Sequence, residues 1–461
     1  MNKTELIHHV PKIIAVIVLV VAGIMVWSCA GSKKGAAKSV IVHPEWSKNA
    51  VIYEVNIRQY TPEGTFRAFE QQLPRLKAMG VDILWLMPIN PIGLENRKGT
   101  LGSYYSVRDY LGINPEFGTL DDFKALVKKI HELGMHVIID WVANHTSWDN
   151  HLITEHPNWY SHDSTGRIIP PVPDWTDAAD LDYDNKDLRE YMTNALIYWV
   201  KEADIDGFRC DVAGMIPVDF WNKAVPRIKT VKPVFMLAEW ETPEMHDMAF
   251  DMTYSWDVYH LMNEIAKGKK TADMLDSLRI KESAKYPADA YRMQFTTNHD
   301  ENSWNGTEYE RMGDAAKTFS VLCYTIPGMP LIYSGQESAF NRRLKFFDKD
   351  FIDWGNFPLE GFYTTLNKMK KENMALSNGS AGGEMIKVAS DNDKNIYSFL
   401  RKKDNNTVFV ILNLSPSRQK ATLKGKSYAG DYRNLFENNG LHTDGSLEVT
   451  LKPWEYRVYN K

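Results

Sequence analysis

Apolar and polar positions follow a repeating order from about residue 48 onwards. Short apolar runs alternate with longer segments in which apolar residues recur at helical spacing. The run VDILWLMP at 81–88 is apolar on both faces, as buried parallel strands are. Thr119 opens a helical segment with Asp122 three residues on, a variant of the capping box. This order predicts alternating strands and helices, and therefore an α/β fold.

Eight strand-like runs fit this description. They cover residues 50–57, 81–88, 135–145, 207–214, 233–240, 249–256, 291–302 and 329–337. Eight strand–helix units predict a (β/α)₈ barrel over residues 48–374. The stretch 145–185, rich in Pro, Asp, His and Trp and without clear periodicity, predicts a short inserted domain after the third strand.

The pattern changes from about residue 375. NIYSFLRKKDNNTVFVILNLS reads as two strands around a polar turn, and the final segment LEVTLKPWEYRVYNK alternates apolar and polar residues. Residues 375–461 are therefore expected to form a C-terminal antiparallel β-sandwich domain.

The N-terminus is typical of an export signal. Lys3 and Lys12 precede an apolar run at 13–27, which is shorter than the roughly 20 residues of a membrane-spanning helix. Cys29 follows Ser28 in a setting similar to a bacterial lipoprotein cleavage box. We expect a signal at 1–29 with lipidation of Cys29, a linker at 30–47 and an exported, membrane-tethered protein. An uncleaved signal anchor with an unmodified cysteine is the alternative.

Composition narrows the function classes only slightly. The net charge is −5 and no basic block occurs, which argues against nucleic-acid partners. The three cysteines form neither a disulfide framework nor a Cys-x-x-Cys metal motif. Aromatic residues make up 12%, which fits a large core and also a cleft lined with flat rings for sugars. We expect a monomer.

Acidic residues stand at the ends of several predicted strands. Asp140, Asp211, Glu239 and Asp300 end the third, fourth, fifth and seventh strands. Arg209 and Asp211 share one face of their strand, because residues two apart point the same way. One such pair fits a structural ion pair. Several acids at one barrel mouth raise each other's pKa, and that arrangement indicates acid, base or nucleophile chemistry.

Four stretches in order, DWVANH, GFRCDVAG, LAEW and TNHDEN, resemble the signature regions of the alpha-amylase family of glycoside hydrolases. The stretch GSYYSVRDYLGINPEFGTLDDF is also similar to that family. The resemblance implies a retaining glycosidase that cleaves α-1,4-glucosidic bonds of starch, maltodextrins or related α-glucans.

The resemblance also implies roles for single residues. Asp211 matches the nucleophile, Glu239 the general acid and base, and Asp300 the acid that binds the sugar hydroxyls. Arg209 beside Asp211 should favour the ionised nucleophile, and the apolar setting of Glu239 should raise its pKa. A retaining mechanism needs the two carboxyl groups only about 5–5.5 Å apart.

Further residues match the substrate-binding set of the family. His145 and His299 match histidines that bind the sugar, and Asp140 supports that site by pairing with Arg209. Tyr104 matches the stacking tyrosine.

Calcium is an open alternative, and no organic cofactor is expected. Asn144, Asp180 and the backbone carbonyl of Met215 align with calcium ligands of many amylases. This chain has Gly214-Met215 where many members have Lys-His, which also removes a lysine that grips sugar further along the cleft.

Several rival functions stay open at this point. GQESAFNRRLKFFDKDFIDW is similar to neopullulanases and cyclomaltodextrinases, whose extra N-terminal β-domain has no room before residue 48. An oligo-1,6-glucosidase or a glucosyl-transferring relative is another alternative. A catalytically silent, membrane-anchored transporter partner or a glycan-binding protein is the non-enzyme alternative. The complete set of three acids favours an enzyme.

Overall fold

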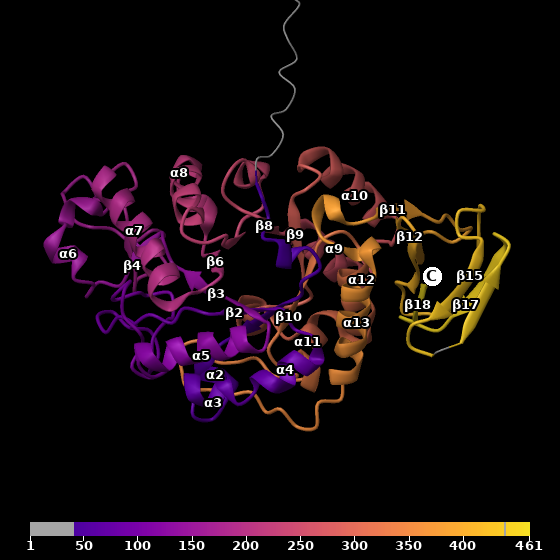
Figure 1. Ribbon diagram of the computed structural model, residues 1–461, viewed down its shortest axis with the longest axis horizontal. Coiled ribbons are helices and arrows are strands. Elements are labelled where there is room, and N and C mark those ends of the chain that lie inside the picture. Colours follow the sequence, from indigo (N-terminus) through magenta and orange to yellow (C-terminus); the bar gives the residue numbers. More distant parts are fainter. Residues whose placement is uncertain (1–40, 438) are drawn as a thin grey trace, which may run out of the picture. The chain divides into compact units, whose positions relative to one another are not determined.

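The computed structural model describes residues 41–461 except residue 438. Eight parallel strands close into a barrel in the order β1-β10-β9-β8-β7-β6-β3-β2 (Figure 1). Their bounds are β1 Ile52–Val55, β2 Ile83–Leu86, β3 His136–Trp141, β6 Gly207–Cys210, β7 Phe235–Ala238, β8 Met252–Tyr254, β9 Tyr291–Gln294 and β10 Met329–Tyr333. The predicted (β/α)₈ barrel is confirmed, including the short strand at 252–254.

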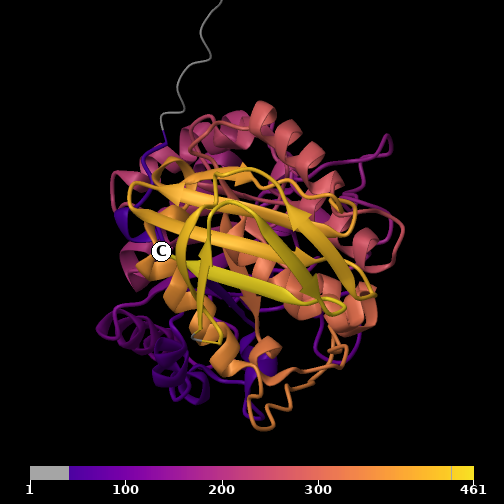
Figure 2. The ribbon, with the colours of Figure 1, turned by 90° about the vertical axis from the view of Figure 1, so that its right-hand side faces the viewer.

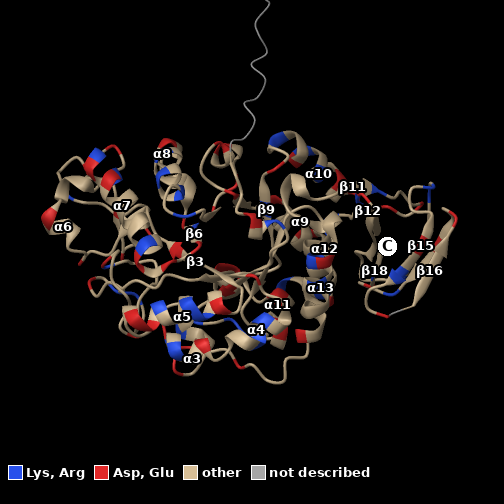
Figure 3. Cartoon of the chain, viewed as in Figure 1, with Lys and Arg blue, Asp and Glu red and all other residues tan. Residues whose placement is uncertain are grey.

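Helices cover the outside of the barrel. They are α2 Ile57–Tyr60, α3 Phe66–Glu70, α4 Leu73–Met79, α5 Leu120–Glu132, α6 Leu152–Glu155, α7 Lys186–Ala203, α8 Val218–Lys229, α9 Trp256–Ala266, α10 Met274–Lys285, α11 Glu308–Met312, α12 Ala316–Thr325 and α13 Glu360–Glu372. Helix α5 starts at the capping box of Thr119 and Asp122, as its sequence predicts. Basic and acidic residues are interspersed along the outer helices (Figure 3).

Apolar side chains fill both faces of the barrel strands. Alternate residues such as Ile52, Trp85 and Leu237 form a cluster inside the barrel. The intervening residues pack against the helices in a larger cluster. Because the barrel interior is packed, polar chemistry is confined to the ends of the strands.

An insertion separates the third and fourth barrel strands. Within it, β4 His145–Thr146 pairs antiparallel with β5 Ala179–Asp180, and α6 lies between them in the sequence. This pairing ties the far end of the insertion back to the residues that follow β3.

The C-terminal region forms two facing antiparallel sheets, as predicted. The larger has the order β11-β12-β13-β18-β15-β16 and the smaller pairs β14 with β17 (Figure 2). Their bounds are β11 Glu384–Lys387, β12 Ile396–Lys403, β13 Asn406–Asn413, β14 Gln419–Leu423, β15 Gly430–Asn434, β16 Gly440–Thr443, β17 Leu447–Leu451 and β18 Tyr456–Asn460. Phe409 and Ile411 of the larger sheet share one apolar cluster with Val449 and Leu451 of the smaller.

The expected signal at 1–29, with Cys29, lies outside the described residues, and so does most of the expected linker. Among the residues that the structure describes, no helix is both long and apolar enough to cross a membrane.

Candidate active site

The residues that follow β6 and β7 point two carboxylates at the same end of the barrel. Asp211 comes directly after β6, and its backbone N–H donates to Trp141 O at 3.0 Å. Glu239 comes directly after β7, and its N–H donates to Cys210 O at 3.0 Å. The parallel hydrogen-bond ladder thus continues one residue beyond each strand and fixes the direction of both side chains.

One guanidinium group holds three carboxylates together. Arg209 Nη1 donates to Asp140 Oδ1 at 2.8 Å and to Asp211 Oδ1 at 2.9 Å. Its Nη2 lies 2.8 Å from Glu239 Oε2 as an ion pair, without the geometry of a hydrogen bond. The side chain of Arg209 is fully buried, and these partners explain why the strand accommodates a charge.

The electrostatics of this cluster favour a retained proton. Burial raises the pKa of Asp211 well above its usual range, and the charge of Glu239 raises it further, while Arg209 opposes both. Burial also raises the pKa of Glu239, with Arg209 again opposing and Asp300 adding to the rise. Three carboxylates around one cation leave excess negative charge in a largely buried site, so one carboxyl is favoured in its protonated form.

The turn after β6 is shaped by its packing against Trp240. Val212 adopts a left-handed conformation with φ 37°, which is strained for a β-branched residue. A Cβ on Gly214 would lie 2.0 Å from the Trp240 ring. Only glycine therefore fits at 214 beside Trp240, which gives a physical reason for Gly214 where many members of the family have lysine. The backbone N–H of Val212 donates to Glu239 Oε2 at 2.8 Å.

His299 lies at the centre of a second charged group. Its Nδ1 lies 2.5 Å from Glu54 Oε1, and its Nε2 lies 3.2 Å from Asp300 Oδ2 and 2.8 Å from Tyr105 Oη. Burial alone would lower the pKa of His299, but Asp300 and Glu54 raise it well above the usual value. Burial alone would raise the pKa of Asp300. The charge of His299 and its hydrogen bond instead hold the pKa of Asp300 below its ordinary range.

Glu54 is a site residue that sequence reasoning missed. It is fully buried in β1, where the run VIYEVNI carries a single acid. A lone acid in a strand that is otherwise buried was the available signal, since such a group needs a partner.

The structure corrects the expected stacking tyrosine. Tyr104 is 1% exposed, and its ring lies under the Arg58 guanidinium, 4.3 Å from the ring centroid. Tyr105 instead lines the cleft, donates to Asp140 Oδ2 at 3.0 Å and stacks on His299. The motif GSYY holds two adjacent tyrosines, and the resemblance alone assigned the wrong one of the pair.

The cleft has a volume of about 620 Å³. Asp211, Glu239, Asp300 and His145 line it, and burial lowers the pKa of His145 to about 4, so its imidazole is neutral at neutral pH. The aromatic content fits a cleft lined with flat rings, but sequence reasoning did not identify its residues, which are Tyr105, Trp175, Trp304, Phe346 and Phe347. Beyond Glu239, a second hollow is lined by Trp240 and Trp256.

Two of the three expected calcium ligands, Asn144 and Asp180, lie close together. Leu181 N donates to Asn144 O at 3.1 Å, so the β4–β5 pairing brings Asn144 close to Asp180. Burial and Asp182 raise the pKa of Asp180, and no cationic side chain of the described residues pairs with it. Amide and carboxylate oxygens fit a hard cation such as Ca²⁺. The third expected ligand, the carbonyl of Met215, ends the 3₁₀ turn Ala213–Met215. Calcium binding stays a prediction.

Within residues 41–461, apart from 438, no group of three or more His, Cys, Asp or Glu side chains is placed to hold an ion.

Comparisons with known proteins show the family of the chain. The family model described as alpha amylase, catalytic domain, matches residues 33–167 and 173–276, and that of the maltogenic amylase C-terminal domain matches 386–458. The crystal structure of a noncanonic maltogenic alpha-amylase from Thermotoga neapolitana superposes with a TM-score of 0.81 at 33% identity. The match covers 90% of this chain and 99% of that one.

Two curated relatives have lower sequence identity to this chain than that crystal structure has. Alpha-amylase MalA from Haloarcula japonica is 26% identical over 440 residues, which cover 90% of this chain and 63% of the relative. A cyclomaltodextrinase from a Bacillus species is 25% identical over 425 residues, which cover 80% of this chain and 73% of the relative. The chain thus spans less than two thirds of the length of MalA. With an amylase-type barrel, three acids at its mouth and matches across both domains, the chain belongs to the alpha-amylase family of glycoside hydrolases.

Proposed function

We propose that this chain is a retaining alpha-amylase that hydrolyses α-1,4-glucosidic bonds of maltodextrins and related α-glucans through a covalent glycosyl-enzyme. The observation that carries the proposal is the contact of one buried guanidinium, Arg209, with both Asp211 and Glu239. A shared cation keeps the two carboxyl groups close, which suits the separation of about 5–5.5 Å in retaining enzymes rather than the wider spacing of inverting ones.

The hydrogen bonds of Asp211 and Glu239 differ, and this difference supports different roles for the two acids. Asp211 accepts a hydrogen bond from Arg209, which opposes the rise in the pKa of Asp211 caused by burial and by Glu239. We propose that Asp211 reacts in its ionised form, with Oδ2 attacking the anomeric carbon. Glu239 has only an ion-pair contact with Arg209, and its Oε2 accepts from Val212 N, which leaves Oε1 to carry the proton. These contacts support the assignment of Asp211 as the nucleophile and Glu239 as the acid, which the sequence resemblance implies.

The reaction then proceeds in two balanced displacements. Asp211 forms a bond to the anomeric carbon while the glycosidic bond breaks, and Glu239 gives its proton to the departing oxygen. In the second displacement Glu239, now ionised, takes a proton from a water molecule, whose oxygen replaces Asp211 at the same carbon. Two inversions retain the configuration.

The residues around the acids position the sugar. Asp300, ionised beside a charged His299, can accept hydrogen bonds from sugar hydroxyls, and the neutral ring of His145 can donate or accept. The ring of Tyr105 offers a flat face next to His299. Trp240 and Trp256, beyond the acid Glu239, line a hollow where the departing part of the glucan can lie.

Cyclomaltodextrin and short-chain activity is the second candidate. Phe346 and Phe347, from the stretch that resembles cyclomaltodextrinases, form an aromatic wall of the cleft with Trp304. Incubation with maltoheptaose, pullulan and cyclodextrin separates these activities by their products. Preferred hydrolysis of maltoheptaose supports the amylase, and faster hydrolysis of cyclodextrin supports the second candidate.

The Asp211→Asn variant tests the chemistry itself. It should lose turnover with its circular dichroism unchanged, because the charge changes but the shape does not. Asp184→Asn, at an exposed aspartate of the insertion, is the matched control and should hydrolyse normally. Substantial hydrolysis by Asp211→Asn, or an inverted product anomer in NMR spectra, would contradict the mechanism.

The location of the protein is proposed from the sequence alone. We propose export and membrane tethering through a lipidated Cys29, with the alternative of an uncleaved anchor. Fractionation of cells that express the Cys29→Ser variant tests this. Release of enzyme from the membrane supports lipidation, and unchanged retention supports the anchor.

A further inference from the structure

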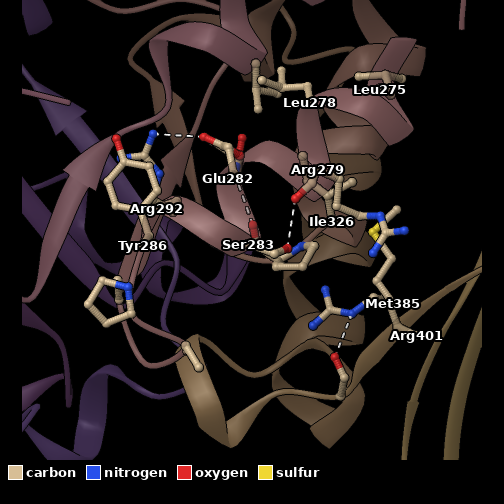
Figure 4. A pocket seen from close by; sticks show the side chains of 18 of the residues that line it. Leu275, Leu278, Arg279, Glu282, Ser283, Tyr286, Arg292, Ile326, Met385 and Arg401 are labelled. Carbon is tan, nitrogen blue, oxygen red and sulfur yellow. Dashed lines mark hydrogen bonds and ion pairs between the residues drawn. The ribbon is translucent and has the colours of Figure 1, made fainter. Parts of the chain in front are cut away.

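A cavity of about 310 Å³ lies between the outer side of β9 and the C-terminal sheet, separate from the active-site cleft (Figure 4). Helix α10, strand β9 and the segment after α12 contribute its barrel side, and β11 and β12 contribute its other side. None of its lining residues lines the active-site cleft. Its size falls at the lower end of the range for small-molecule pockets, about 300–1,000 Å³.

Most of the cavity wall is apolar. The apolar residues include Val258, Leu275, Leu278, Ile326, Pro327 and Met385. The charged lining residues are Arg279, Arg292, Arg401 and Glu282, so positive charges predominate in the wall.

Among the described residues, no carboxylate pairs with the buried Arg401. It is 2% exposed, and its guanidinium donates only to neutral carbonyls, from Nε to Gly383 O at 3.2 Å and from Nη1 to Thr325 O at 3.0 Å. Arg292, in the same wall, pairs with Glu241 and with Glu282. Figure 4 shows the Arg401 side chain reaching from β12 into the pocket, with Met385 beside it.

The charge of Arg401 persists in this setting. Burial lowers the pKa of Arg401 to about 10, so the group stays protonated at neutral pH. Burial, and then the charge of Arg401, lower the pKa of Lys370, a nearby buried lysine held by three neutral oxygens. An unpaired charge in a dry interior is costly, and a bound anion would remove that cost.

Several other polar atoms of the wall residues have no hydrogen bond, and Gln294 Oε1 is the acceptor among them that has no donor of its own. Gln294 Oε1 is buried without a hydrogen bond, although Gln294 Nε2 donates to Pro327 O at 3.1 Å. A ligand that brings a polar donor into the cavity would satisfy this acceptor.

We propose that this cavity binds a small organic acid with one carboxylate and an apolar body, the carboxylate resting on Arg401. The N–H groups of Arg401 that do not bond to the two carbonyls can donate to a planar carboxylate. A single negative charge balances the single unpaired cation, whereas a dianion would leave excess charge in an apolar cavity. The apolar body lies against the leucine and methionine side chains of the wall.

Such a ligand would bridge the two domains. It would contact α10 and β9 of the barrel together with β11 and β12 of the C-terminal sheet. Because it does not reach the active-site cleft, it stabilises the fold by mass action rather than by changing the chemistry.

The test uses the full-length protein and the probe 3-phenylpropanoate, with the neutral alcohol 3-phenylpropanol as its matched partner. Isothermal titration should give binding of the acid at least about ten-fold tighter than of the alcohol, and the acid should raise the unfolding temperature. Arg401→Met should weaken binding of the acid at least ten-fold. The exposed Arg418→Met is the control and should bind like the wild type.

A second variant tests the cavity in a protein that retains Arg401, in case Arg401→Met fails to fold. Leu278→Trp fills the cavity but keeps Arg401 with both its carbonyl partners, and it should abolish binding while glucan hydrolysis continues. The proposal is overturned if the wild type does not bind the acid, if the acid and the alcohol bind equally, or if Leu278→Trp and Arg401→Met bind as the wild type does.

Discussion

Two adjacent tyrosines illustrate how a single residue decides the geometry of the cleft. Tyr104 and Tyr105 point to different surroundings, one under Arg58 and the other into the cleft. Tyr105 joins the two charged groups of the site, because its Oη contacts both Asp140 and His299.

The Tyr105→Phe variant should lose about 10- to 100-fold in kcat/KM, because a hydrogen bond to a charged group contributes about 1.5–3 kcal/mol. Tyr104→Phe, with the same chemical change outside the cleft, should hydrolyse maltodextrins at nearly the wild-type rate. Steady-state kinetics on maltoheptaose compares them. Equal losses in both variants would contradict the placement of Tyr105 in the cleft.

Glu54 should act as a positioning residue through His299. It raises the pKa of His299, so the charged imidazole beside Asp300 persists below that raised pKa and is lost as the pH rises through it. In Glu54→Gln the pKa of His299 should fall, and the alkaline limb of the kcat/KM profile should move to lower pH. We expect activity near pH 5 to fall less than activity near pH 8.

A merely structural role for Glu54 would lower activity equally at all pH values. Glu54→Asp, which keeps the charge, should restore part of the alkaline limb.

At the scale of elements, the N-terminal end of β6 is tied to its neighbours by a buried acid. Asp206 accepts from Val137 N at 2.8 Å, and its carboxylate lies 2.8 Å from His131 Nε2 and 2.9 Å from Lys232 Nζ. Burial works against this charge, but His131, His136 and Lys232 hold the pKa of Asp206 far below its usual range. The contacts link β3, α5 and β6 at the end of the barrel opposite the active site.

Asp206→Asn should therefore destabilise the fold in a pH-dependent way. The lowered pKa of Asp206 contributes stability above the unfolded value of about 3.9, and the raised pKa of His131 contributes below about 6.5. The loss in unfolding free energy should be about 3–5 kcal/mol near pH 5 and smaller at an alkaline pH above the raised pKa of His131, where the imidazole is neutral. Urea unfolding at the two pH values measures this, and an equal loss at both would contradict the role of His131.

At the scale of the whole molecule, the barrel and the C-terminal sheets share buried apolar surface. Tyr397, Phe399 and Val410 of the larger sheet belong to the same cluster as Phe362 and Leu366 of helix α13. Arg401 and Thr318 add hydrogen bonds across the same boundary.

Scanning calorimetry should therefore show one cooperative transition for these two domains. A shared core couples their unfolding, whereas independent domains would melt separately. Phe399→Ala, which removes a shared core side chain, should lower the single midpoint by several degrees, as the loss of about 3–5 kcal/mol implies. Two resolved transitions in the wild type would contradict the coupling.

The order of the strands and the acids at their ends were predictable from the sequence, because both depend on local patterns. Apolar runs mark buried strands, parallel strands bring their carboxyl ends together, and spacing by two puts Arg209 and Asp211 on one face. Those rules need no knowledge of distant contacts, so the barrel and the convergence of the acids followed from the chain alone.

Only the tertiary structure decided which partners each charged group has. Glu54 contacts His299, 245 positions away in the sequence, and Tyr105 rather than Tyr104 enters the cleft. Among the described residues, the buried Arg401 guanidinium has only carbonyls as hydrogen-bond partners. No local pattern encodes these facts, because the free energy of a buried charge depends on the groups that folding brings around it from elsewhere in the chain.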